Sequence, residues 1–427
     1  MRARATLSLL LCALLTACSF DADTSNPDEP PADLVSTPIG PDGVALTTTI
    51  AANAWVTHTF EVTALSDIDA VLDWSTTTVN LNLFLYDPTG ALVVYSNGPS
   101  TRPETVSYEG ATPGTWKIGI KNKSSTSTVY SLSVTTTPIF VARYPAQPVP
   151  GTVFWGASIG GNSDPVARHE VPSGHVLSVH RTFWQWTQRT GSMITTASDD
   201  IAHGRLPWIS TKTPSWAAMA AGTYDAQIDE MLRALDALPG PVWLTIHHEP
   251  EGGGGVNAPD DPAGPAGHVA MNRRVRERMT ALGVDNVALA PILMTYTWTA
   301  ASGRNPDVWW APGIYDFLGV DHYKDAQASL LDSTWSSVRR WAAARSVDVA
   351  VGEWGMRGTD AAAGARVRAW YEAAIASNAD GAGARTVGLS AFDSNLNSST
   401  GGWELMGEQL TVFRQLLGDP RTASILP

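Results

Sequence analysis

Two hydrophobic patterns divide the chain, and the first is an alternation of apolar and polar positions between residues 44 and 137. The segment LNLFLYDPTGALVVYS (81–96) reads as two strands joined by an Asp-Pro-Thr-Gly turn. TWKIGIKN (115–122) and TVYSLSVTT (128–136) alternate in the same way, and no stretch of this region has a helical period. We therefore predict an all-β sandwich over residues 44–137.

In the second pattern, from residue 151 onward, short continuous apolar runs alternate with longer amphipathic stretches. Eight runs read as strands: VFWGASIG (153–160), VLSVHRTF (176–183), LPWIS (206–210), VWLTIHH (242–248), VALAPILM (287–294), FLGVDHY (317–323), VAVGEWG (349–355) and TVGLSAFD (386–393). Continuous apolar runs are typical of parallel strands that are buried on both faces. Intervening stretches such as YDAQIDEMLRALDAL (224–238), MNRRVRERMTALG (271–283) and TWSSVRRWAAARS (334–346) predict helices. The repeats predict a (β/α)8 TIM barrel over residues 151–427. No G-x-G-x-x-G follows the first strand, which disfavours a dinucleotide-binding open sheet.

The remaining segments predict an export signal and two linkers. Arg2 and Arg4 precede the short apolar run LSLLLCALL, which is typical of a signal peptide over residues 1–17. Residues 18–43 are rich in Pro, Asp and Ser and read as a flexible tether. Residues 138–150 contain four prolines and read as the linker between the sandwich and the barrel.

Charge and cysteine usage narrow the class of protein. The formal net charge of −13 argues against a nucleic-acid-binding protein. The chain has two cysteines, and Cys12 lies inside the predicted signal, so we expect no disulfide in the mature protein. LTAC, which ends at Cys18, resembles the bacterial lipobox. That resemblance implies cleavage before Cys18, lipidation of its thiol, and a lipoprotein anchored to the membrane at the cell surface or in the periplasm.

Polar and reactive side chains gather where the predicted barrel strands end, which is where barrels of this class carry their chemistry. They are His180, Arg181, His247, His248, Glu249, Tyr296, Trp298, Asp321, His322, Tyr323, Glu353 and Asp393. We therefore expect the site at this end of the barrel.

Two kinds of chemistry fit these residues. A metal-dependent hydrolase would draw ligands from His180, His248 and Asp321. Against this, the first strand has no His-x-His pair, and the adjacent His247 and His248 point to opposite faces of a strand. The other chemistry needs two carboxylates across the barrel mouth, about 5 Å apart, for cleavage of a glycosidic bond with retention. Glu249 and Glu353, at the ends of the fourth and seventh predicted strands, would supply them.

The barrel region resembles glycoside hydrolase family 26 in HHEPEG (247–252), DVWWAPGIYDFLGVDHY (307–323) and VAVGEWG (349–355). The resemblance implies a retaining mechanism without a cofactor, in which Glu249 is the general acid/base and Glu353 the nucleophile. It also implies that His248 orients or hydrogen-bonds Glu249 and that Tyr323 hydrogen-bonds Glu353. Glu251 is the rival for the acid role, but it follows Pro250, where we expect the strand to have turned away.

Tryptophan usage bears on the ligand. Fourteen of the 17 tryptophans lie beyond residue 150, and aromatic faces stack on sugar rings. We expect Trp298 and Trp354 in the cleft, and Asp321 and His180 as supporting residues of the site. The resemblance favours β-mannan as substrate, ahead of β-glucan and β-xylan. The loop GGGGVNAPDDPAGPAG (252–267) departs from the mannan-cleaving pattern because it contains no aromatic residue.

The sandwich region resembles the bacterial pre-peptidase C-terminal domain in NLNLFLYDPTG, WKIGI and YSLSV. The resemblance implies an accessory unit of a secreted hydrolase that either binds carbohydrate or acts as a spacer. For the whole chain we expect a monomer whose partners are a polysaccharide and, through the lipidated N-terminus, a membrane. A third interpretation is a surface lipoprotein that binds polysaccharide without cleaving it.

Overall fold

The computed structural model describes residues 30, 34–39, 46–99, 101–252, 258–324, 328–396 and 402–426. The predicted signal peptide, Cys18 and most of the predicted tether lie outside these residues. The chain forms two compact units, one ending at Ile139 and one beginning at Phe140. No helix in the described part of the chain is both long and apolar enough to cross a membrane.

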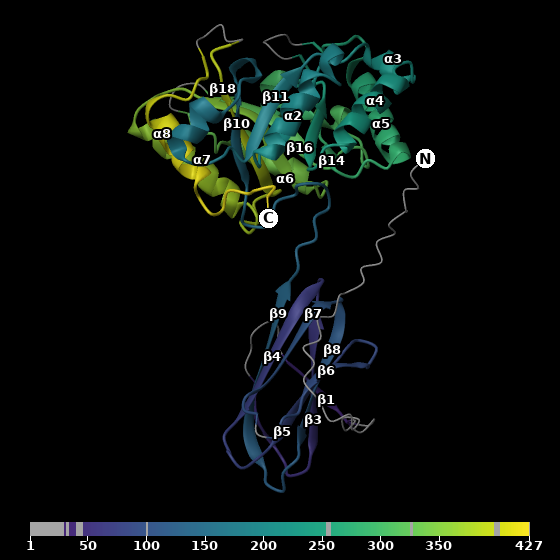
Figure 1. Ribbon diagram of the computed structural model, residues 1–427, viewed down its shortest axis with the longest axis vertical. Coiled ribbons are helices and arrows are strands. Elements are labelled where there is room, and N and C mark those ends of the chain that lie inside the picture. Colours follow the sequence, from purple (N-terminus) through teal and green to yellow (C-terminus); the bar gives the residue numbers. More distant parts are fainter. Residues whose placement is uncertain are drawn as a thin grey trace. The chain divides into compact units, whose positions relative to one another are not determined.

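The first unit is a sandwich of two β-sheets built from strands β1 to β9 (Figure 1). One sheet has the order β1 (Ser36–Pro38), β3 (Trp55–Val62), β8 (Gly114–Asn122), β5 (Leu81–Tyr86), β6 (Leu92–Ser96). The other has the order β2 (Leu46–Ile50), β9 (Thr128–Pro138), β4 (Ser66–Trp74), β7 (Glu104–Ala111). Every second residue of these strands enters a core that includes Leu83, Ile118 and Leu132. The predicted all-β sandwich is confirmed.

The second unit is a parallel sheet that curls into a ring. Its strands are β10 (Phe154–Ile159), β11 (Val179–Trp184), β12 (Leu206–Thr211), β13 (Val242–Ile246), β14 (Val287–Leu289), β15 (Ile292–Met294), β16 (Leu318–Lys324), β17 (Val349–Met356) and β18 (Thr386–Asp393). Apart from β14 and β15, each is hydrogen-bonded to the next, and β18 returns to β10. β14 pairs with β13 and β15 with β16, so the ring has its break within the fifth predicted strand.

Ala290 and Pro291 lie at that break, and each makes one hydrogen bond to a neighbouring strand. The amide of Ala290 donates to the Leu244 carbonyl, and the amide of Gly319 donates to the Pro291 carbonyl. Pro291 has no amide hydrogen to donate, so the regular hydrogen bonding of this strand is interrupted and the strand is divided into two halves. β14 and β15 therefore occupy one of eight strand positions, and the predicted (β/α)8 TIM barrel is confirmed.

Helices cover the outer face of the ring (Figure 1). They are η2 (Val166–Glu170) with α1 (Val171–Ser173), α2 (Ser192–Ala202), α3 (Trp216–Ala220), α4 (Asp225–Asp236), α5 (Gly264–Leu282), α6 (Ser333–Ala343), α7 (Ala361–Ala376) and α8 (Gly407–Leu417). Between β15 and β16 there is no α-helix in residues 295–317, all of them described; the turns η4 (Thr295–Trp298), η5 (Ala300–Ser302) and η6 (Pro306–Trp309) take its place. Pro306 and Pro312 each remove an amide donor there, which corrects the expectation of a helix after every strand.

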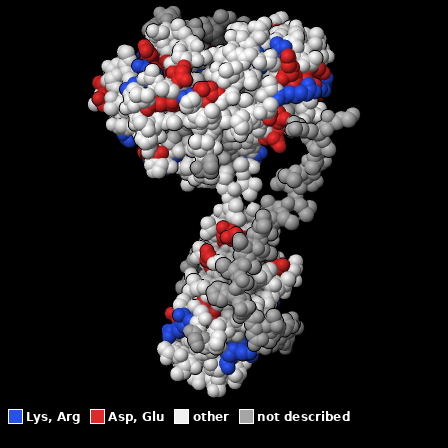
Figure 2. Space-filling model, viewed as in Figure 1, with Lys and Arg blue, Asp and Glu red and all other residues white. Residues whose placement is uncertain are grey.

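Two layers of apolar side chains hold the barrel together. One lies between the strands and the helices and includes Trp155, Leu244 and Trp354. The other fills the inside of the ring below the strand ends and includes Trp208, Trp243 and Phe317. In the view of Figure 2, acidic and basic side chains are interspersed on the surface of this unit.

Candidate active site

A cavity of about 710 Å³ opens at the carboxyl ends of the barrel strands. Four of the predicted site residues line it: Glu249, Glu353, His248 and Tyr323. Its walls carry the aromatic side chains of Phe183, Trp184, Phe392 and Trp403. The cavity therefore combines two carboxyl groups with flat apolar surfaces.

A β-bulge at Gly352 turns Glu353 toward this cavity. Val351 pairs with Val320 of β16, but the next pair joins Glu353 to Asp321, so Gly352 has no partner. Because side chains alternate along a strand, one additional residue moves every later side chain to the other face. A Cβ on residue 352 would lie 2.6 Å from Ile292 Cδ1 and 3.0 Å from Asp321 Oδ1. Only glycine fits this position without displacing the neighbours.

The carboxylate of Glu353 has two groups that favour its charged form. The Tyr323 hydroxyl donates to Glu353 Oε2 over 2.6 Å. Arg181 is fully buried inside the ring and lies over the Phe183 and Trp208 rings at 4.5 and 5.4 Å. Burial is the largest effect and raises the pKa of Glu353 above its usual value, although the Arg181 charge and the Tyr323 hydrogen bond act in the opposite direction. The predicted hydrogen bond between Tyr323 and Glu353 is present.

Glu249 stands on a turn that leaves the end of β13. His247 and Glu249 both have left-handed backbone conformations, with φ of 60° and 48°. Such a conformation costs roughly 1–2 kcal/mol for a residue other than glycine. The Glu249 amide donates to the Ile292 carbonyl over 2.8 Å. The Glu249 carboxyl group, in contrast, has no hydrogen-bond partner among the described residues. Burial, with the charges of Glu353 and Glu251 beside it, raises the pKa of Glu249 to about 8.

Glu251 is buried and faces away from the cavity. Its Oε1 accepts from the Met294 amide and from the Thr297 hydroxyl, both at 2.8 Å. Burial raises the pKa of Glu251 to about 7. Its hydrogen bonds tie the turn to η4, so its carboxyl group is engaged in structure.

The adjacent histidines have separate environments. His248 lines the cavity and packs on the Phe183 ring at 5.3 Å, and its Nδ1 has no partner among the described residues. No hydrogen bond joins it to Glu249 among the described residues, so of the two predicted roles only orientation of Glu249 stays a prediction. Burial and the Arg181 charge hold the pKa of His248 well below its usual value.

Asp321 lies inside the ring behind Glu353 and is 3% exposed. Neither carboxyl oxygen has a hydrogen-bond partner among the described residues. Burial and the charges of Glu353 and Glu249 raise the pKa of Asp321 well above its usual value. Asp321 therefore does not line the cavity but adds to the electrostatic environment of the two glutamates.

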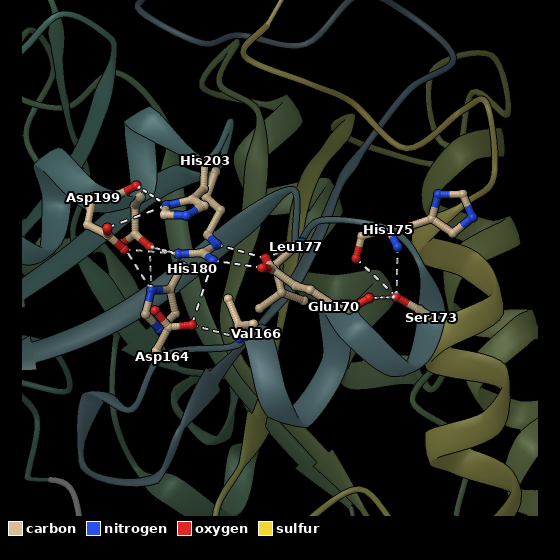
Figure 3. Close-up of polar contacts among 11 residues, drawn as sticks. Asp164, Val166, Glu170, Ser173, His175, Leu177, His180, Asp199 and His203 are labelled. Carbon is tan, nitrogen blue, oxygen red and sulfur yellow. Dashed lines mark hydrogen bonds and ion pairs between the residues drawn. The ribbon is translucent and has the colours of Figure 1, made fainter.

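His180 lies on the opposite face of β11, away from the cavity, which corrects its predicted place in the site. Its Nδ1 lies 2.8 Å from Asp200 Oδ1 of α2. Asp200 also accepts from Arg205, which in turn donates to Glu170. Figure 3 shows His180 and Glu170 within this cluster of polar contacts. The predicted metal ligands His180, His248 and Asp321 therefore do not converge. Among the residues with described placement, no three His, Cys, Asp or Glu side chains gather at one point.

Trp298 and Trp354 are also not in the cavity wall. Trp354 is fully buried between strands and helices and stacks on Trp155 with a centroid distance of 5.4 Å. Trp298 packs edge-to-face against Trp341 of α6 at 5.5 Å. Both predictions of a cleft position are wrong, because each side chain falls on the face that packs against helices.

Sequence reasoning missed several residues of the cavity wall. Trp403 lies in the segment between β18 and α8 and packs on Tyr323 at 4.8 Å. Lys212 follows β12, and Asp260 precedes α5. Lys212 directly follows a strand end and could have been found by extending the predicted strand by one residue. Trp403 and Asp260 lie far from any strand end and carry no such signal.

Comparison with known proteins gives partial matches. Residues 56–122 match the family described as bacterial pre-peptidase C-terminal domain. No curated protein sequence matches the chain. Among solved structures, a modular endo-β-1,4-mannanase of glycoside hydrolase family 26 from Cellulomonas fimi is 17% identical, with 65% of this chain and 73% of that chain covered and a TM-score of 0.47.

Two further solved structures bear on the two units. A ruminal GH26 endo-β-1,4-mannanase is 10% identical, with 88% of this chain and 90% of that chain covered and a TM-score of 0.46. The pre-peptidase C-terminal domain of a Bacillus anthracis collagenase is 15% identical, with 25% of this chain and 99% of that chain covered and a TM-score of 0.22. Both families that the sequence resembles thus recur among the matches.

Proposed function

We propose that this protein is a retaining glycoside hydrolase that cleaves a β-linked polysaccharide, with Glu249 as general acid/base and Glu353 as nucleophile. The observation that carries the proposal is that two carboxyl groups line one cavity and only one of them, Glu353, has a hydrogen-bond donor and a nearby guanidinium. Glu249 has no partner among the described residues and a raised pKa, whereas Glu353 accepts a hydrogen bond and lies near a buried guanidinium. In such a pair, the carboxyl group with the higher pKa keeps its proton and acts as the acid, and the group that stays ionised acts as the nucleophile.

The chemistry takes two steps. Glu353 attacks the anomeric carbon while Glu249 gives its proton to the departing glycosidic oxygen, so that an ester to Glu353 forms as the C–O bond breaks. The ionised Glu249 then takes a proton from water, whose oxygen attacks the same carbon and releases Glu353. Tyr323 and Arg181 would stabilise Glu353 as a carboxylate before attack and after release.

The sugar is proposed from the aromatic walls and from the sequence. Trp184 and Trp403 offer flat faces on which pyranose rings can stack. β-Mannan leads among the substrates because of the motifs around Glu249 and Glu353, with β-glucan and β-xylan behind. The sandwich would serve either to bind carbohydrate or as a spacer, and Cys18 would anchor an exported chain to the membrane.

The test is product analysis over a panel of plant and microbial β-glycans with the wild-type protein and the variants Glu249→Gln and Glu353→Gln. We expect oligosaccharide products from one class of glycan and a loss of at least about 1,000-fold in kcat in each variant. Melting temperatures near that of the wild type would show that folding is kept. Binding without product release by the wild-type protein, or full activity of either variant, would contradict the proposal.

A further inference from the structure

The side chain of His247, in the turn that carries Glu249, is held by residues from the segment after β12, from α3 and from the segment before α5. Its Nδ1 lies 3.1 Å from the Thr213 hydroxyl and 3.2 Å from Trp216 Nε1 of α3. Its Nε2 lies 2.9 Å from Asp260 Oδ2. Lys212 Nζ lies 3.1 Å from the same carboxylate. Lys212 Nζ also lies 3.3 Å from His247 Nε2. The imidazole is buried, with 9% of the side chain exposed, so these contacts are its whole polar environment among the described residues.

The contacts permit one protonation state of this ring. The indole N–H of Trp216 can only donate, so Nδ1 must be the unprotonated acceptor. Nε2 then carries the hydrogen and donates it to Asp260 at 2.9 Å. The Lys212 ammonium, 3.3 Å from Nε2, directs a hydrogen to the same carboxylate at 3.1 Å and not to the ring nitrogen. An imidazolium, or the other neutral tautomer, would set N–H against N–H at Trp216. His247 is therefore neutral and protonated on Nε2.

The charged and titratable groups that face His247 agree with this state. Burial and the Lys212 charge lower the pKa of His247, against the opposing effect of Asp260 and Asp261. His268 of α5 packs on the other side and reaches the His247 carbonyl from its Nε2 at 3.3 Å. The pKa of His268 is lowered to about 3, so it adds no positive charge.

The backbone between β13 and Pro250 depends on this anchor. The His247 amide donates to Thr211 of β12 over 3.0 Å, and the Glu249 amide donates to Ile292 of β15 over 2.8 Å. The Asp260 amide donates to the Pro250 carbonyl over 3.1 Å, so the residue that holds the imidazole also holds the end of the turn. Two left-handed residues within three positions need such restraint to persist.

We propose that His247, locked between Trp216 and Asp260, is a positioning residue that fixes the left-handed turn and so aims the carboxyl group of Glu249 at the leaving oxygen. The proposal rests on the proposed function of Glu249. His247 does not line the cavity and acts through the turn.

The first measurement does not depend on activity. Long-range 1H–15N NMR of the full chain with labelled histidine, assigned by loss of the signal in His247→Gln, reports the tautomer directly. We expect neutral, Nε2-protonated His247 from about pH 5 to about pH 8. In Trp216→Phe, which removes the indole N–H but keeps an aromatic ring, we expect the second tautomer or the imidazolium to appear. A wild-type His247 that titrates, or that is protonated on Nδ1, would overturn the proposal.

The second measurement separates positioning from general damage. A dinitrophenyl glycoside leaves as a stable anion and needs little protonation, whereas a methylphenyl glycoside needs the acid. The dinitrophenyl and methylphenyl substrates are β-mannobiosides, or β-cellobiosides if product analysis selects glucan. On the methylphenyl substrate, the variants Trp216→Phe and Asp260→Ala should lose about 10- to 100-fold in kcat/KM. On the dinitrophenyl substrate we expect a loss of less than about threefold in the glycosylation step.

The matched control is Asp200→Asn, which weakens the buried His180–Asp200 contact on the outer face of β11. It should lower the melting temperature without changing the ratio of the two rates. Equal losses on both substrates in the Asp260 and Trp216 variants, as in the control, would show that His247 only stabilises the fold and would contradict the proposal. If the wild type cleaves no glycan while the NMR result holds, the proposed function fails and the catalytic part of this inference with it; the locked tautomer stands.

Discussion

At the scale of single residues, the site depends on how each side chain is turned at the end of its strand. Arg181, Asp321, Tyr323 and Glu353 point into the ring, whereas each of their neighbours His180, His322 and Trp354 packs against helices. The sequence predicted that reactive residues gather at these ends, and two carboxyl groups with a tyrosine do line the cavity. It wrongly placed His180 and Trp354 in the site, because the direction of a side chain depends on backbone turns and bulges that leave no mark in hydrophobicity.

The Tyr323 hydroxyl provides a test at this scale. Tyr323→Phe removes the hydrogen bond to Glu353, which favours the carboxylate, so the pKa of Glu353 should rise. Activity is lost on the acid side when Glu353 becomes protonated, so the acid limb of the kcat/KM profile should move to higher pH by about one unit. The alkaline limb, which follows deprotonation of Glu249, should stay near its pKa of about 8. Profiles of wild type and variant on a soluble oligosaccharide measure both limbs, and an unchanged acid limb would contradict the role given to Tyr323.

At the scale of elements, continuous apolar runs located the barrel strands well. β18 has the predicted bounds, 386–393, and β13 differs only where the turn at His247 begins. The division of the fifth strand into β14 and β15 was not predicted, since Pro291 interrupts pairing without interrupting the apolar run. The missing helix after β15 could have been foreseen from Pro306 and Pro312. The bulge in β17 could not, because a glycine within an apolar run also fits an unbroken strand.

The bulge gives a prediction for β17. Gly352→Ala places a methyl group against Ile292 and Asp321, and such overpacking should lower the free energy of unfolding by about 1–3 kcal/mol. It should also lower kcat because Arg181 and Glu353 must shift. Chemical denaturation and kinetics measure the two effects.

At the scale of the whole molecule, the two compact units have separate cores. One core contains only side chains from residues 50–134, and the barrel cores contain only side chains from residue 144 onward. The linker residue Tyr144 belongs to the barrel, where its hydroxyl donates to Asp348 over 2.8 Å. Each unit thus buries its own apolar surface, which is what independent folding requires.

A chain of residues 140–427 should therefore fold and keep its activity on soluble oligosaccharides within about twofold. If the sandwich binds carbohydrate, the same chain should lose activity on insoluble glycan, because the local substrate concentration falls. If the sandwich is a spacer, both activities should be kept. Rates on the two substrates for the full and shortened chains decide between these roles, and loss of the soluble activity would contradict independent folding.

The unpaired glycine in β17 also determines which changes of strand length the site could accept. Removing Gly352 would join Val351, which faces the helices, directly to Glu353, so plain alternation would leave Glu353 facing into the ring and Trp354 facing the helices. A residue inserted between Gly352 and Glu353 would instead take the place opposite Asp321 and turn Glu353 toward the helices. The direction of this carboxyl group is therefore insensitive to a one-residue deletion at the bulge and sensitive to a one-residue insertion.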